Sequence, residues 1–159
     1  MKEIRIGWAE TDITPEGRVS LSGQYYNRTS TGIHSRLKAV AMALESEEGD
    51  AAVMVSLDVA AVPARFLRAL REDVTALCPE LDVSKIMVSA THTHSAPGLH
   101  KVRIWWLQPE AGCMDQDEYG AMIINGMVGS KGGAVFVERS IAAIDDLFRS
   151  SRAHIGRER

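Results

Sequence analysis

The feature that most constrains the fold is a succession of three segments between residues 51 and 94. A short apolar run, AAVMVSLDV, is followed by PARFLRALREDVTALC and then by a second apolar run, KIMVSATHTH. In the middle segment, apolar residues recur at helical spacing, namely Phe66, Leu67, Leu70, Val74 and Leu77. Strand, helix and strand in this order form a βαβ unit, whose two strands are parallel and whose crossover is right-handed.

Two further strands are predicted before this unit. EIRIGWAETDIT alternates apolar and polar residues, so that Ile4, Ile6 and Trp8 share one face. LKAVAMALE is apolar on both faces, which indicates a buried strand, and the polar turn SEEGD joins it in a hairpin to AAVMVSLDV. The sequence therefore predicts an α/β fold: a mixed sheet of about four strands (a hairpin plus a parallel βαβ unit) with packed helices.

The remaining segments are a loop and two helices. The stretch 21–36, LSGQYYNRTSTGIHSR, is rich in Gly, Ser, Thr and Asn, and we predict a long loop of the kind that is often functional. Helices are expected over 115–128 and 134–148. The whole chain of 159 residues is expected to form a single domain.

Charge and hydropathy exclude several classes of protein. The net charge is −3 and the chain has no basic stripe, which argues against binding of nucleic acid. No segment approaches the roughly 18 apolar residues of a membrane span, and the N-terminus lacks the apolar core of a secretory signal. Cys78 and Cys113 have no metal-type spacing and suit a reducing compartment, so we expect a cytoplasmic protein.

Three of the five histidines lie in VSATHTHSAPGLH, and two of them are one residue apart. In an extended strand His92 and His94 would point to the same face, with Cα atoms about 6.5 Å apart. Two imidazoles at this spacing can converge on one metal ion, and neutral imidazole is a good ligand for zinc. Asp58 ends the parallel neighbour strand and is expected at the same rim, which His34 can reach from the loop.

Each of these residues has an alternative interpretation. The two histidines could be a surface pair bonded to neighbouring hydroxyls, and Asp58 could cap the helix that follows it. Ser95 stands in turn chemistry, Ser-Ala-Pro-Gly, which favours a turn over a nucleophile. The sequence RIWWLQP, with its paired tryptophans, could form an apolar lip for a lipid or a partner, or could be part of the core. A metal store that uses His34, His92, His94 and His100 is a further possibility.

Four segments together resemble a known family. GWAETDITP, SGQYY…TGIHSRLKAVAMALE, AAVMVSLD and IMVSATHTHSAPG occur in the order and approximate spacing of the N-terminal domain of the neutral/alkaline (non-lysosomal) ceramidase family. Thr-His-Thr-His-Ser-x-Pro and Gly-Ile-His…Leu-x-Ala are the most specific parts. The resemblance is good from about Ile4 to Gly98, and the chain corresponds to about the first third of the family's catalytic domain.

The resemblance implies a zinc amidase that hydrolyses N-acyl bonds of a small or lipid-like amide. It implies that His92 binds the single zinc ion, that His94 lies beside the metal and the substrate, and that His34 lines the same cavity. Asp58 as a third metal-binding residue is inferred from topology alone. The family's later ligands and its nucleophile have no counterpart here, so we expect weak or absent activity from this chain alone, and a homo-oligomer or a complementing chain as its partner. The alternative function is a non-catalytic α/β module that binds a protein partner through its C-terminal third.

Overall fold

The computed structural model describes residues 4–99 and 108–128. Within these ranges the chain forms four strands, two α-helices and one 3₁₀ turn: β1 (Ile4–Asp12), β2 (Lys38–Ser46), β3 (Ala51–Leu57), α1 (Ala64–Leu77), η1 (Val83–Lys85), β4 (Ile86–Ala90) and α2 (Gln116–Val128). The predicted helix over 134–148, the pair Trp105–Trp106 and His100 lie outside the described residues.

The four strands form one mixed sheet in the order β1-β2-β3-β4. The first three are antiparallel neighbours, and β4 pairs in parallel with β3 through the crossover that contains α1. The predicted α/β fold, with its hairpin and its βαβ unit, is therefore confirmed. No helix in the described parts of the chain is long and apolar enough to span a bilayer.

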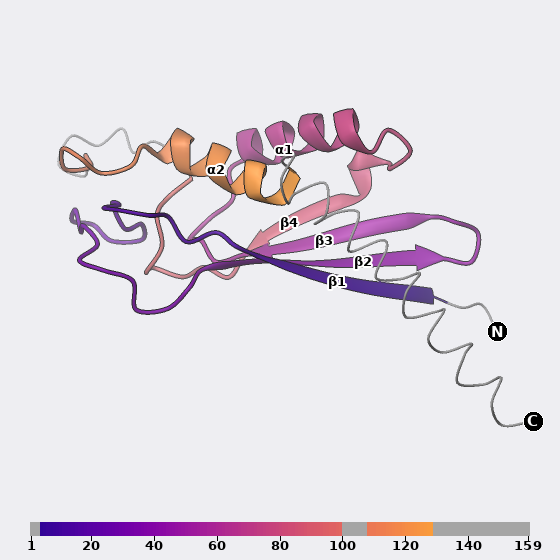
Figure 1. Cartoon of the computed structure of the whole chain (residues 1–159), viewed down its shortest axis with the longest axis horizontal. Helices are drawn as coiled ribbons and strands as arrows, with labels where there is room; N and C mark the ends of the chain where they lie inside the picture. The colour runs from indigo at the N-terminus through magenta and orange to yellow at the C-terminus, as the bar shows by residue number, and fades with distance from the viewer. Residues whose placement is uncertain (1–3, 100–107, 129–159) are drawn as a thin grey trace, which may run out of the picture.

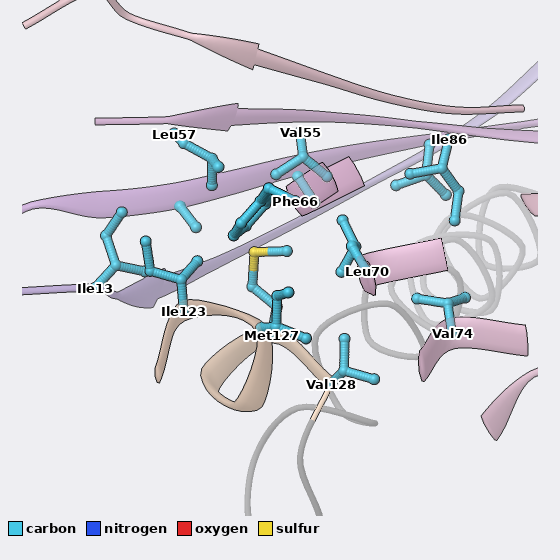
Figure 2. Close-up of a cluster of buried hydrophobic side chains, with 14 of the residues drawn as sticks. Ile13, Val55, Leu57, Phe66, Leu70, Val74, Ile86, Ile123, Met127 and Val128 are labelled. Atoms are coloured by element: carbon cyan, nitrogen blue, oxygen red, sulfur yellow. The ribbon is translucent and has the colours of Figure 1, made fainter. Parts of the chain in front are cut away.

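Both α-helices lie on the same face of the sheet (Figure 1). Their apolar side chains pack on that face, where β2 presents small alanines and β3 presents branched residues. Figure 2 shows Phe66 and Leu70 of α1 beside Met127 of α2, between the helices and Val55 of β3. The small side chains of β2 let the two helices approach the sheet closely, which fixes the layer above the strands.

The helix α1 begins where the sequence predicts and ends before a proline. Pro63 is its N-cap residue, and its carbonyl accepts the first amide bonds of the helix. Asp58 is therefore not the cap, and that alternative for its carboxylate is wrong. Pro79 follows the C-cap residue Cys78, and the helix ends there because the residue before a proline disfavours helical dihedral angles.

The opposite face of the sheet is not covered by any helix in the described residues. One row across the four strands pairs Trp8 with Met42, Met42 with Met54, and Met54 with Met87. Trp8 is 59% exposed and Met87 is 54% exposed. Ile4, Ile6 and Trp8 of β1 do share one face, as predicted. It is the open face of the sheet, the one that no helix in the described residues covers.

The polar segments gather at the end of the sheet where β3 and β4 end (Figure 1). The chain from 13 to 37 contains no helix or regular strand, as predicted, and makes only isolated bridges, Ser20 with Thr29 and Leu21 with Pro97. The second of these bridges joins this segment to the residues that follow β4. The fold therefore places the long loop, residues 21–36, against the histidine segment, which is the stretch after β4 that contains His92 and His94.

Candidate functional site

The histidine pair does not lie in an extended strand, and this part of the prediction is wrong. β4 ends at Ala90, and Thr91 makes the next backbone bond by donating to the carbonyl of Leu57 at 2.9 Å. His92 then adopts a φ of +62°, in the left-handed region. This conformation costs a residue with a Cβ about 1–3 kcal/mol and persists only where the surroundings impose it.

The turn at His92 nevertheless brings the two rings together. The Nε2 atoms of His92 and His94 lie 3.4 Å apart, and the ring centroids are 5.0 Å apart with the planes at 75°. In an extended strand the two rings would point the same way because side chains two residues apart share a face. Here the turn of the backbone at His92 brings the rings together instead. The predicted pairing of these two side chains therefore holds, although its predicted geometry does not.

A backbone carbonyl fixes the tautomer of His92. Its Nδ1 lies 2.6 Å from the carbonyl oxygen of Ala60, in the segment between β3 and α1. Because a carbonyl oxygen only accepts hydrogen bonds, Nδ1 carries the hydrogen and the neutral ring presents a lone pair on Nε2. Metal-binding histidines almost always donate their other ring nitrogen in this way.

The pair fits two positions of a zinc site. Two imidazole nitrogens bound tetrahedrally at about 2.05 Å from one zinc ion are about 3.4 Å apart, which is the separation of these two atoms. In the absence of a metal, the same separation suits a weak hydrogen bond from Nε2 of His94 to Nε2 of His92. As a metal ligand through Nε2, His94 would instead carry its hydrogen on Nδ1. Among the described residues no group of three His, Cys, Asp or Glu side chains lies close enough to hold a metal ion.

Asp58 directly follows β3, as predicted, but its carboxylate continues the sheet. Its Oδ2 accepts from the backbone N–H of Lys38 at 2.9 Å, and its own N–H donates to the Lys38 carbonyl at 3.0 Å. These two bonds extend the pairing of β2 and β3 by one residue. The structure does not bring Asp58 into a metal-holding group with the two histidines.

A cavity of about 730 Å³ opens beside the histidine pair. His34 and Asp58 both line it, as do Thr93 and Ser95, the residues adjacent to the two histidines in sequence. Its apolar wall comes from the long loop and its flanks, with Val19, Leu21, Ile33 and Leu37. His34 thus lines a cavity together with Asp58, whereas the rings of His92 and His94 are not part of the cavity wall.

Two ion pairs lie at the paired ends of β1 and β2, and one of them involves Arg36, which lines the cavity. Hydrogen bonds from the Thr14 hydroxyl and backbone hold the pKa of Asp12 below its ordinary value, helped by Arg36, whose guanidinium lies 3.4 Å from the carboxylate. The hydrogen bond to Glu10 raises the pKa of Lys38. Among the residues that line the cavity, Arg28 and Arg36 are cationic and Asp58 is anionic, so its wall carries charges of both signs.

Sequence reasoning missed three residues that shape this site: Ala60, Gly23 and Arg28. The carbonyl of Ala60 orients His92, while Gly23 and Arg28 contact His94 from the long loop. A backbone carbonyl leaves no trace in the residue type, and Arg28 stands in an Asn-Arg-Thr string that reads as a glycosylation motif. Only the glycine of SGQYY carries a signal, as a position where a side chain is excluded.

Ser95 lies in a turn, where its N–H donates to the Thr93 hydroxyl at 3.2 Å.

Comparisons with known proteins bear on the family and the fold of the chain. Residues 4–135 match the family described as neutral/alkaline non-lysosomal ceramidase, N-terminal. Among solved structures, the neutral ceramidase from Pseudomonas aeruginosa is similar, with a TM-score of 0.69 and 24% sequence identity over 88% of this chain and 22% of that chain. A ceramidase complexed with C2 has a TM-score of 0.66 and 25% identity over 88% of this chain and 21% of that chain.

A comparison with curated proteins finds no match. The chain spans about a fifth of the length of the two solved ceramidases, since it covers 22% and 21% of their chains. The family match, by contrast, extends over most of this chain and includes the loop, the βαβ unit and the histidine pair. The chain therefore belongs to the neutral/alkaline non-lysosomal ceramidase family, whose N-terminal region it matches.

Proposed function

We propose that this protein acts as a ceramidase-like, zinc-dependent hydrolase of N-acyl (amide) bonds, or as one part of such an enzyme. The observation that carries the proposal is the histidine pair: two Nε2 atoms 3.4 Å apart, one of them on a ring whose Nδ1 is bonded to the Ala60 carbonyl. Membership of the ceramidase family supports amide hydrolysis as the reaction.

In this proposal His92 holds the zinc ion through Nε2. His94 directs its own Nε2 at the same point, where it can be a second ligand or donate to the oxygen of the amide. The chemistry that zinc supplies in such a site is Lewis acidity, which polarises an amide carbonyl and stabilises negative charge on its oxygen. His34 faces the adjoining cavity, where it would contact the substrate.

The lining of the cavity supports a substrate with both apolar and hydroxyl-bearing parts. Hydroxyl side chains of Thr29, Ser30 and Thr31 line the same cavity as the apolar residues described above. A lipid-like amide has both characters, since its chains are apolar and its head group is polar. The volume of about 730 Å³ is within the usual range for a small-molecule site.

Two ligands do not complete a catalytic zinc site, which normally has three protein ligands and one open position. The remaining ligands would come from residues outside 4–99 and 108–128 or from another polypeptide. We therefore expect this chain on its own to bind zinc measurably but to turn over substrate weakly or not at all.

The test is the zinc content of the untagged purified chain, measured by mass spectrometry after zinc is supplied at neutral pH. We expect about one zinc per chain or per dimer in the native protein. His92→Ala should lose the metal and His94→Ala should bind it more weakly, whereas His34→Ala, the matched control, should keep it. Absence of zinc from the native chain would overturn the proposal.

The alternative function, a module that binds a protein partner through the C-terminal third, depends largely on residues 100–107 and 129–159. These residues lie outside the described ranges, so this alternative stays a prediction. A zinc-free but monodisperse native chain would favour it over the hydrolase.

A further inference from the structure

The imidazole of His94 lies directly against the backbone of Gly23. A Cβ atom built at Gly23 would be 2.4 Å from Cγ and 2.6 Å from Nδ1 of the His94 ring, well inside the contact distance of real atoms. The φ of Gly23 is +93°, which side chains rarely adopt. The close approach and the backbone conformation independently require glycine at this position.

The backbone of His94 is held by a second residue of the same loop. Arg28 donates a hydrogen bond from Nη2 to the carbonyl oxygen of His94. A guanidinium bond to a carbonyl is charge-assisted and stronger than a neutral one. Arg28 thus fixes the peptide that follows the His94 side chain, while Gly23 supports its ring.

The loop that carries Gly23 and Arg28 is itself anchored. Leu21 donates to the carbonyl of Arg28 at 2.8 Å, and the Ser20 hydroxyl is bonded to Asn27 at 2.9 Å, so that the two arms of the loop pair with each other. The N–H of Ser22 donates to the carbonyl of Ala96 at 2.9 Å, which attaches the loop to the histidine segment. The loop and the histidine segment therefore form one hydrogen-bonded unit.

The two histidines are consequently held by different parts of the fold. His92 is oriented from the β3–α1 connection, through the carbonyl of Ala60. His94 is oriented from the long loop, through Gly23 and Arg28. The separation of 3.4 Å between their Nε2 atoms depends on both supports.

We propose that Gly23 and Arg28 are positioning residues that set the His94 imidazole opposite His92. Neither residue needs to touch a metal or a substrate for this role. The functional consequence rests on the proposed metal-binding role of the pair, but the positioning itself does not, because it can be observed in the metal-free protein.

The first experiment is proton NMR of the metal-free chain, with the ring signals of the histidines assigned. Ring centroids 5.0 Å apart predict a nuclear Overhauser effect between the His92 and His94 imidazoles, and the contact described above predicts one between His94 and the Gly23 Hα protons. In Arg28→Met both effects should weaken or vanish, and Arg28→Lys, which keeps a cationic donor, should restore them in part. Arg68→Met is the charge-matched control, since Arg68 is exposed on α1, and should leave both effects unchanged.

The second experiment is a zinc titration of the same variants by calorimetry. Residues that orient a metal ligand typically change metal affinity 10–100-fold, so we expect Arg28→Met to bind zinc about tenfold more weakly and Arg68→Met to match the native chain. Gly23→Ala should weaken binding at least as much, because its Cβ displaces the ring. Circular dichroism identifies any variant that fails to fold, and Arg28→Lys then replaces it in the comparison.

The outcomes separate the two proposals. If native and variant chains bind no zinc but Arg28→Met loses the ring contacts, the positioning role stands and the proposed hydrolase fails. If Arg28→Met keeps the native ring contacts and, where zinc binds, the native affinity, the positioning role is overturned.

Discussion

The phenol of Tyr119 on α2 donates a hydrogen bond to the carbonyl oxygen of Ile13, at 3.1 Å. Both residues are buried, with exposed fractions of 0% and 1%. Ile13 is the first residue after β1, where the chain leaves the sheet for the long loop, so this bond ties α2 to the base of the candidate site. It is a contact between segments that are far apart in the sequence.

Replacing Tyr119 with phenylalanine should destabilise the protein while preserving its packing. The substitution leaves the Ile13 carbonyl buried without this donor, which typically costs about 1–3 kcal/mol. We expect the free energy of unfolding in urea to fall by this amount. Tyr25→Phe is the control, because Tyr25 is 95% exposed and its replacement should change stability by less than about 0.5 kcal/mol.

The same residue should contribute to alkaline unfolding. Burial, with a smaller effect of the negative charges of Asp58 and Asp12, raises the pKa of Tyr119 above its ordinary value. Above about pH 10 the phenol of the unfolded chain loses its proton while that of the folded chain keeps it, so the folded state binds more protons and stability falls as pH rises. Urea unfolding between about pH 9 and pH 11 should show a shallower decrease for Tyr119→Phe than for the native chain. Equal slopes would contradict this assignment.

The core between α1 and the sheet offers a matched pair of leucines on one helix. Leu70 is 1% exposed and Leu77 is 48% exposed. Leu70→Ala removes buried methyl groups and leaves a cavity, for which the typical cost is about 2–5 kcal/mol. Leu77→Ala should cost far less, and similar losses for the two variants, measured by chemical denaturation, would show that α1 does not pack as described.

The strands and α1 could be predicted because buried side chains recur at every second residue in a strand and at every third or fourth residue in a helix. Phe66, Leu70 and Val74 recur at helical spacing, and all three are buried against the sheet. Alternation in β1 likewise revealed that Ile4, Ile6 and Trp8 share a face. Periodicity shows which residues face the same way, but it does not show whether that face is covered, and no helix within residues 4–99 and 108–128 covers it.

The geometry of the site could be predicted only in part. The His-x-His string indicated that the two rings converge, but the positive φ of His92 has no signature in the sequence, because histidine is not a residue that such a turn requires. That turn is imposed by contacts from elsewhere, from the Ala60 carbonyl and from the loop with Arg28. Contacts of this kind depend on the tertiary fold and leave no local pattern.

The open face of the sheet should affect solubility more than stability. Trp8 is 59% exposed in a row of apolar residues that runs across all four strands. Exposed contiguous apolar surface favours association and dye binding. We expect Trp8→Lys to lower the fluorescence of a bound hydrophobic dye and to raise the concentration at which the chain remains monodisperse in sedimentation. Dye binding equal to that of the native chain would show that this face is covered.

Asp58→Ala distinguishes a metal ligand from a residue that supports the sheet. The carboxylate accepts from the Lys38 amide at 2.9 Å, beside the bond that the Asp58 amide makes with the Lys38 carbonyl. Loss of this charged acceptor should reduce the free energy of unfolding by about 1–2 kcal/mol, and Asp58→Asn, whose amide oxygen still accepts, should lose less. Zinc content should remain native in both variants, because the structure does not bring Asp58 into a metal-holding group with the two histidines. His92→Ala should show the opposite pattern, with the metal lost and the sheet intact. A folded Asp58→Ala protein that has lost its zinc would instead make Asp58 the third ligand that the strand topology predicts.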